Sequence, residues 1–268
     1  MSRYYREKPN IEDMSRLVRI VFSVAIPIMF LSIFLQGTSE LTGLEIVKKA
    51  NDLRYGETSK GSMDMTLIRP TWKRTLSLKM WTKGTDYSMV IITAPAKEKG
   101  QVFMKRKTEM WNWIPKISRM IKLPPSTMSQ GWMGSDYTND DMMNEGSIVN
   151  KFNHKVLRIE KFENMDCYVI ESTPKDDDAV VWGKKMMWIS KADFFTLKTE
   201  SYDEDMYLVK TEISSEIKQM GGKRLPSKFE IIPADNPGYK TVVVLSDIVF
   251  NEALSESFFS QQNMKRIR

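Results

Sequence analysis

Apolar residues fall at helical spacing near the start of the segment that follows residue 40. Over residues 42–53 (TGLEIVKKANDL) the apolar positions share one face of a helix. Thr42 and Glu45 have the spacing of a capping box, in which each side chain binds the other residue's backbone N–H. Gly56 is suited to end the helix. The pattern therefore predicts one amphipathic helix that stops near Gly56.

The period changes to two from residue 61 onward, which is typical of strands. Met63, Met65 and Leu67 alternate with polar neighbours, and similar short runs recur roughly every 8–14 residues with turn residues between them. This spacing predicts an antiparallel meander or barrel, mainly β in an α+β chain, within a single domain over residues 40–268. The last run, residues 239–250, is apolar at almost every position. We therefore expect a helix or lid to cover its second face.

Residues 124–150 interrupt the strand pattern. Two prolines, two glycines and a polar stretch make this segment long and irregular, and residues 139–141 have the character of a helix start. Loops of this length in a compact domain commonly act as lids or binding loops. We predict a lid here, and a plain Ω-loop is the alternative.

The N-terminal 39 residues have the pattern of an export signal. Residues 20–35 (IVFSVAIPIMFLSIFL) carry no charge and follow a basic segment. The run is shorter than the roughly 20 residues of a comfortable membrane-spanning helix. Gly37 and Ser39 make a small-x-small pattern, which indicates cleavage after Ser39. The pattern therefore predicts a signal peptide or an uncleaved signal anchor over residues 1–39, and both place residues 40–268 outside the cytoplasm.

Composition narrows the possible chemistry. The 268 residues carry a net charge of +6, which is too mild to predict nucleic-acid binding. There is one cysteine, Cys167, and one histidine, His154, so a disulfide and most metal and nucleophile sites are not expected. Phosphate-binding glycine motifs and zinc motifs are absent from the sequence. Asp140 and Asp141 are predicted to be solvated. We therefore expect no enzyme, no cofactor and no bound metal.

The segment 110–132 (MWNWIPKISRMIKLPPSTMSQGW) combines large apolar residues with basic ones. This combination suggests lipid binding. A cavity lined by Met, Trp and Ile with basic residues at its mouth suits an acyl chain. The candidate lining residues are Trp81, Met104, Trp111, Trp113, Ile114, Ile117, Met120, Ile121, Leu123, Trp132 and Met133. The candidate rim residues are Lys116, Arg119 and Lys122. An ordinary core with exposed lysines is the alternative interpretation.

Several of these residues also carry a family resemblance. They are Trp111-x-Trp113-x-Pro115, Arg119, Leu123-Pro124 and residues 134–141 (GSDYTNDD). Together with the export signal, the first helix and the strand meander, they resemble the LolA-like group of outer-membrane lipoprotein-sorting proteins. The similarity extends over nearly all of the chain after residue 40, and it is to the longer branch of the group rather than to LolA itself.

The resemblance implies a strongly curved, incomplete antiparallel β-barrel with covering helices. It also implies a monomeric, non-catalytic periplasmic protein that carries or binds the acyl chains of lipoproteins or lipids in envelope sorting. Free lipid or a glycolipid is an alternative cargo, and an inner-membrane export permease is a candidate partner. The alternative function is that of a protein-interaction module for such a permease or for an envelope stress sensor.

Overall fold

The computed structural model describes residues 40–144, 148–175 and 180–268. The predicted signal peptide or anchor over residues 1–39 lies outside the described residues. Residues 41–268 form one compact unit. None of the helices in the described ranges has both the length and the apolar composition that crossing a bilayer requires.

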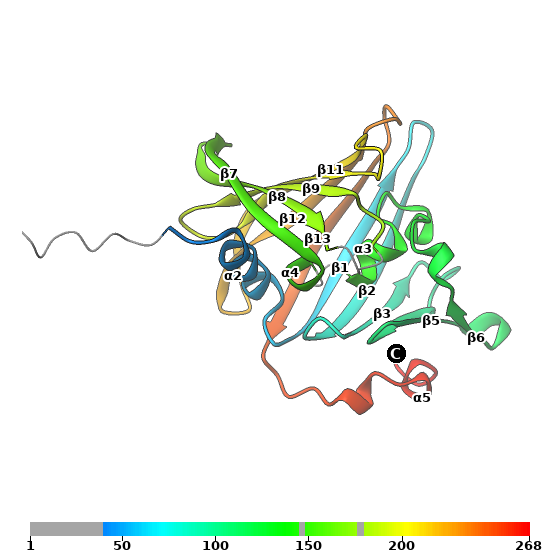
Figure 1. Ribbon diagram of the computed structural model, residues 1–268. Coiled ribbons are helices and arrows are strands. Elements are labelled where there is room, and N and C mark those ends of the chain that lie inside the picture. The colour runs from blue at the N-terminus through cyan, green and yellow to red at the C-terminus, as the bar shows by residue number, and fades with distance from the viewer. Residues whose placement is uncertain (1–39, 145–147, 176–179) are drawn as a thin grey trace, which may run out of the picture. The chain divides into compact units, whose positions relative to one another are not determined.

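Among the described residues, thirteen antiparallel strands form one sheet that curves strongly around its inner face (Figure 1). The strands are β1 (Thr58–Ile68), β2 (Lys73–Lys83), β3 (Tyr87–Ala94), β4 (Val102–Arg106), β5 (Glu109–Ile114), β6 (Arg119–Leu123), β7 (Phe152–Phe162), β8 (Met165–Pro174), β9 (Lys184–Ser190), β10 (Thr196–Tyr202), β11 (Leu208–Met220), β12 (Lys223–Pro233) and β13 (Lys240–Phe250). Consecutive strands are neighbours except β6 and β7, and β1 also pairs with β13. The sheet is not closed, because β6 and β7 are its two edges. The predicted incomplete antiparallel barrel is confirmed.

The predicted first helix is present as α2 (Gly43–Tyr55), with the capping box formed by Thr42 and Glu45. Gly56 follows it with φ of +62°, a backbone conformation that glycine adopts without steric cost. The helix lies against β7, β9 and β12 through its buried face. It therefore covers part of the inner face of the sheet (Figure 1).

The chain between β6 and β7 joins the two edges of the sheet, so it spans the open side of the barrel. It contains η2 (Pro125–Thr127), η3 (Trp132–Gly134), α3 (Asn139–Asn144) and α4 (Ile148–Lys151). Trp132 and Tyr137 pack with Phe103 and other buried residues of the inner face. We call residues 124–142 the plug. Its interior position agrees with the predicted lid better than with a surface Ω-loop.

The outer face is covered only over part of the sheet. The C-terminal tail, residues 251–268, includes η5 (Glu256–Phe258) and α5 (Gln261–Met264) and packs on β3, β4 and β5. The prediction that a helix or lid covers the second face of β13 is wrong. Val242 and Val244 are half-buried there, and their neighbours in register include Lys228 and Glu230 of β12. Charged side chains of the next strand therefore shield these valines in place of a helix.

Candidate functional site

A cavity of about 320 Å³ lies between the C-terminal half of α2 and the inner face of the sheet. Its apolar wall comes from β1, β2, β3, β12 and β13 and is completed by α3. The wall consists of Met63, Met65, Met80, Val90, Met142, Phe229, Val243, Leu245 and Ile248. This volume and lining are typical of a small-ligand site, at the lower end of the usual range of about 300–1,000 Å³.

Methionine dominates the deeper wall. Met63, Met65 and Met80 come from two neighbouring strands, and Met142 approaches from α3. Unbranched thioether side chains adapt to irregular apolar shapes, which suits a ligand without a fixed conformation. The wall is therefore better matched to a flexible hydrocarbon chain than to a rigid ring.

One end of the cavity is polar because of the strand register. Ser59, Thr82, Ser88 and Lys105 face one another across β1, β2, β3 and β4. All four line the cavity. The next paired row toward the interior contains Met80 and Val90. The cavity is thus amphipathic, with a polar row at one end and an apolar wall beyond it.

Lys105 is the charged member of this row, and it is only 7% exposed. Its ammonium donates a hydrogen bond of 2.6 Å to the carbonyl oxygen of Thr85. Burial lowers the pKa of Lys105 to about 8, and the nearby ammonium of Lys151 acts in the same direction. The carboxylates of Asp86 and Asp140 oppose this shift without cancelling it. At neutral pH the cavity wall therefore carries a buried positive charge.

A smaller cavity of about 80 Å³ lies beside the first, on the side of β9 and β10. Asn51, Arg54, Tyr55 and Tyr137 line both cavities and so form the wall between them. The Arg54 guanidinium lies 3.5 Å from a carboxylate oxygen of Glu212 and 4.4 Å from the ring centre of Phe229. This partition is polar and adjustable, since it consists of long side chains rather than backbone.

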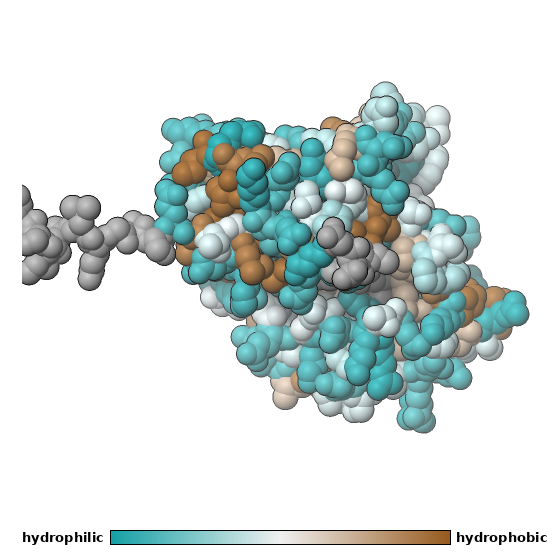
Figure 2. All heavy atoms as spheres, in the orientation of Figure 1, coloured by the Kyte–Doolittle hydropathy of each residue, from teal (hydrophilic) through white to brown (hydrophobic). Residues whose placement is uncertain are grey.

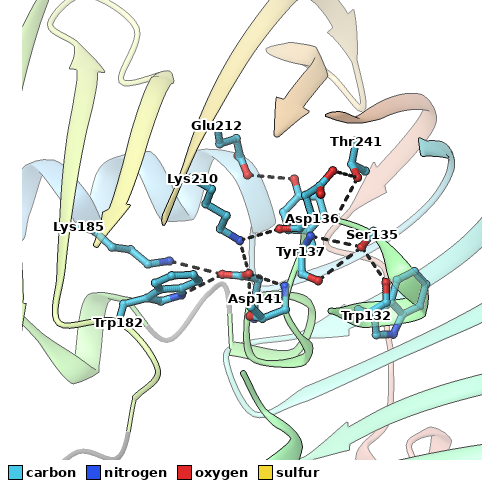
Figure 3. Close-up of polar contacts among 11 residues, drawn as sticks. Trp132, Ser135, Asp136, Tyr137, Asp141, Trp182, Lys185, Lys210, Glu212 and Thr241 are labelled. Carbon is cyan, nitrogen blue, oxygen red and sulfur yellow. Dashed lines mark hydrogen bonds and ion pairs between the residues drawn. The ribbon is translucent and has the colours of Figure 1, made fainter. Parts of the chain in front are cut away.

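The plug is anchored over the inner face by a buried network of polar contacts (Figure 3). Asp141 accepts hydrogen bonds from Lys210, from the Trp182 indole at 3.1 Å, and from the backbone and hydroxyl of Thr138 at 2.7 Å each. Lys185 lies 3.8 Å from the same carboxylate. Burial alone would raise the pKa of Asp141, but the two ammonium groups and the hydrogen bonds lower it to about 2.

A second anchor lies a few residues earlier in the plug. Asp136 pairs with the buried guanidinium of Arg69 at 3.1 and 3.2 Å and accepts a hydrogen bond of 2.6 Å from Thr241. The Tyr137 hydroxyl donates to Glu212 at 2.9 Å. These contacts explain the segment GSDYTNDD as the fastening of the plug to β1, β11 and β13.

The acidic pair in this segment does not match the sequence prediction. Asp140 and Asp141 are buried rather than solvated, because the plug turns inward and strands far along the chain supply lysines to meet it. A carboxylate with a pKa near 2, bound by two lysines, is a poor general base at neutral pH. In the described ranges, no three His, Cys, Asp or Glu side chains gather as a metal site.

The predicted lipid-binding residues are divided between the two faces. Those that lie in the outer cluster beneath the C-terminal tail are Trp81, Met104, Trp111, Trp113 and Met120. Those that belong to the inner cluster with the plug are Leu123, Trp132 and Met133. The remaining lining candidates are half-buried Ile114 and exposed Ile117 and Ile121, and the exposed rim candidates are Lys116, Arg119 and Lys122.

None of these fourteen described residues lines the 320 Å³ cavity, and lipid binding by them stays a prediction. The sequence interpretation missed the residues that do line it, including Met65, Phe229 and Lys105. One signal for Lys105 was available. It follows buried Phe103 at an interval of two, so it occupies an inward position of an otherwise apolar strand.

Comparison with known proteins gives a consistent fold. A family model with the description "Uncharacterized protein" matches residues 84–266. No curated protein matches the sequence. A DUF1329 family protein from Desulfovibrio piger is 21% identical, with a TM-score of 0.76 over 83% of this chain and 97% of that chain.

Two further solved structures agree. A putative outer membrane lipoprotein-sorting protein domain from Vibrio parahaemolyticus is 25% identical, with a TM-score of 0.74 over 84% of this chain and 98% of that one. A LolA superfamily protein from Nitrosomonas europaea is 24% identical, with a TM-score of 0.72 over 83% and 99%. The resemblance noted in the sequence is confirmed.

Proposed function

The chain belongs to the family whose model matches residues 84–266 and has the LolA-like fold, and we propose that it is a non-catalytic carrier or binding protein for acyl chains. The cargo is the lipid part of a lipoprotein or a membrane lipid, and the setting is envelope sorting. The single observation that supports this function most strongly is the methionine-rich cavity on the inner face of the sheet.

Asp52 and Glu57 line the cavity beside its apolar wall, and Asp52 pairs with Lys48 on the surface of α2. The strongly ionised carboxylate near it, Asp141, is engaged in holding the plug. The wall itself offers apolar surface, which hydrocarbon fills at a gain of roughly 25 cal/mol per Å² removed from water. Binding without chemical change is the function that such a wall serves best.

The test is ligand binding by the full-length protein purified without detergent. We expect native mass spectrometry to show a bound acyl-chain ligand. We also expect micromolar binding of a fatty-acylated peptide and no binding of the same peptide without its acyl group. If no ligand copurifies, and if acylated peptide and phospholipid both fail to bind, the carrier function is contradicted.

The residues named from the sequence enter this proposal unequally. Trp132 and Met133 of the plug and Leu123 of β6 share the inner face with the cavity. We propose that they support the bound chain by closing that side of the barrel. Trp113 and its outer neighbours would act on a ligand only if the C-terminal tail moved away.

The periplasm is the proposed location, with residues 1–39 acting as signal peptide or anchor. N-terminal sequencing of the protein recovered from periplasm and from membranes tests this directly. A mature chain that begins at Glu40 is expected for a cleaved signal, and an intact chain in the membrane fraction for an anchor. Recovery of the intact chain from the cytoplasm alone would contradict both.

A second candidate function is a protein-interaction module, with an export permease as the proposed partner. Edge strand β7 exposes Leu157 and Ile159, and α2 exposes Leu44. Figure 2 shows hydrophobic side chains gathered at the surface over β7 and α2. Exposed apolar residues beside an unpaired strand edge suit a partner protein. If Leu157→Ser abolished function in cells while acyl-chain binding in vitro was unchanged, this second function would be favoured.

A further inference from the structure

Lys105, in the polar row at one end of the cavity, has more hydrogen-bond donors than the protein itself uses. Lys105 has three N–H donors, and one of them donates to the carbonyl oxygen of Thr85. No carboxylate of the described residues lies within 4 Å of its ammonium, and the more distant carboxylates of Asp86 and Asp140 offset only part of the effect of burial on its pKa. A lysine ammonium that is only 7% exposed is costly to leave without an anion. The unused donors therefore point to a ligand with negative charge.

A second buried polar group lines the same cavity from the helix side. The Oδ1 atom of Asn51, on α2, is buried and lacks a hydrogen-bond partner. An unpaired buried acceptor costs about 1–3 kcal/mol, so such groups are rare in folded proteins unless something else satisfies them. A ligand O–H or N–H group would satisfy it.

The strand register sets the orientation of any ligand. Lys105 pairs directly with Ser88, and Ser88 pairs with Thr82, so hydroxyl groups extend the polar row away from the ammonium. Met80 and Val90 begin the apolar wall in the next row. A ligand with one polar end would therefore place that end at Lys105 and its hydrocarbon against the methionines.

We infer that the cavity takes a single-chain amphiphile whose head carries an anionic oxygen for Lys105 beside a hydroxyl or amide N–H for Asn51. This inference rests on the proposed acyl-chain function and specifies its ligand. A volume of about 320 Å³ suits one chain better than two or more. The pKa of Lys105, lowered to about 8 mainly by burial, leaves the ammonium charged at neutral pH and ready to pair.

The test compares three probes with the same oleoyl chain by titration calorimetry on the full-length protein. Lysophosphatidic acid has the anion and the hydroxyl, oleate has the anion alone, and monooleoylglycerol has hydroxyls alone. We expect lysophosphatidic acid to bind tightest and monooleoylglycerol to bind about tenfold or more weaker, the usual range for a lost charge-assisted hydrogen bond. Inorganic phosphate at millimolar concentration is expected not to compete.

Variants separate a head-group role from a structural one. Lys105→Met should weaken lysophosphatidic acid by about tenfold or more and leave monooleoylglycerol unchanged. Asn51→Ala should weaken lysophosphatidic acid and monooleoylglycerol while changing oleate little. Lys79→Met, which removes an exposed lysine of β2, is the matched control and should change none of the three affinities.

The outcomes separate the head-group site from the proposed acyl-chain function on which it depends. If none of the three probes binds, the proposed acyl-chain function fails as well. If all three bind equally, or if Lys105→Met weakens them equally, acyl-chain binding stands and the head-group site is refuted. Full competition by inorganic phosphate would instead identify a phosphate site without a chain requirement, and that result would also refute the inference.

Discussion

Both faces of strands β3 and β4 carry large apolar side chains, yet they are closed in different ways. On the outer face, Met89, Ile91 and Met104 are packed by Phe259 and Met264 of the C-terminal tail. On the inner face, Val90 and Phe103 pack with Trp132 and Tyr137 of the plug, and a cavity of about 320 Å³ remains between Val90 and α2. The tail and the outer face form a filled core, whereas the plug and α2 cover the inner face and leave a cavity.

The difference follows from how each cover is attached. The tail is held by exposed or half-buried polar contacts, such as the Tyr87 hydroxyl to Glu256 at 2.7 Å, and by aromatic packing that also fills the space beneath it, with ring centres of Phe259 and Tyr87 5.4 Å apart. The plug is held by buried polar contacts of Asp141 and Asp136 to strands on the far side of the barrel. Ion pairs fix the distance between the plug and the sheet, so side chains do not have to fill the space between them. A carrier needs that arrangement on one face only.

The largest expected loss of stability comes from a substitution that releases the plug from the inner face. Asp141→Ala leaves Lys210 buried without its carboxylate and removes a partner from Trp182. We expect the free energy of unfolding, measured in urea, to fall by about 3–5 kcal/mol, the usual cost of stranding a buried charge. Asp235→Ala, at an exposed turn, is the control and should change stability by less than about 0.5 kcal/mol. Equal losses in both variants would show that the plug is not held by this carboxylate.

The next effect breaks the outer closure. Phe259 is fully buried beneath the tail, and Phe259→Ala should lower the free energy of unfolding by about 3 kcal/mol through lost burial and an unfilled cavity. Acyl-chain affinity should not change, because the residue lies on the opposite face from the cavity. Tyr207→Ala is a matched aromatic truncation at a side chain that is 72% exposed, and it should be nearly neutral. Loss of ligand binding in Phe259→Ala at temperatures where the protein stays folded would argue against separate faces.

This pair of closures also marks what the sequence could and could not reveal. The period of two located the strands well, since alternation follows directly from strand geometry. It could not say which face each tryptophan occupies, because both faces of residues 110–114 are largely apolar. Trp111 and Trp113 are paired with Met104 and Val102 on the outer face, where residues 251–268 return to cover them, and that tail has no periodic signal.

The plug was predictable in position but not in mechanism. Its length and composition indicated a lid, and its short helix begins at Asn139 as expected. Burial of Asp141 was not predictable, since its partner Lys210 lies 69 residues away along the chain. Only the curvature of the sheet brings the two together. Adjacent acidic residues in a polar stretch are usually solvated, and the sequence offered no local reason to expect otherwise.

Alkaline titration sharpens the contrast in polarity between the two faces. The folded pKa of Lys105 is about 8, against an ordinary value of 10.5, so the unfolded chain holds more protons between these two pH values. Stability should therefore rise as pH increases through this window, by about 3 kcal/mol in the limit. Lys105→Met should be more stable than the parent at pH 7 and should lack this part of the rise. An unchanged pH profile would show that the lysine is solvated.

The smallest effect on stability gives the sharpest comparison, because it uses adjacent residues and one substitution. Val90 faces the cavity and Ile91 faces the filled outer cluster. Val90→Phe extends into existing space, so we expect the free energy of unfolding to change by less than about 1 kcal/mol while acyl-chain affinity falls by about tenfold or more. Ile91→Phe overfills a packed core and should cost about 1–3 kcal/mol with affinity unchanged.

These two variants must differ in both measurements if the faces have different roles. Urea unfolding and titration with a fluorescent fatty acid, performed on the same preparations, provide the four values. A Val90→Phe protein that is destabilised as much as Ile91→Phe and binds as well as the parent would mean that the inner space collapses in solution. The methionine wall would then be a core like the outer one, since flexible thioether side chains are able to close such a space without help from a ligand.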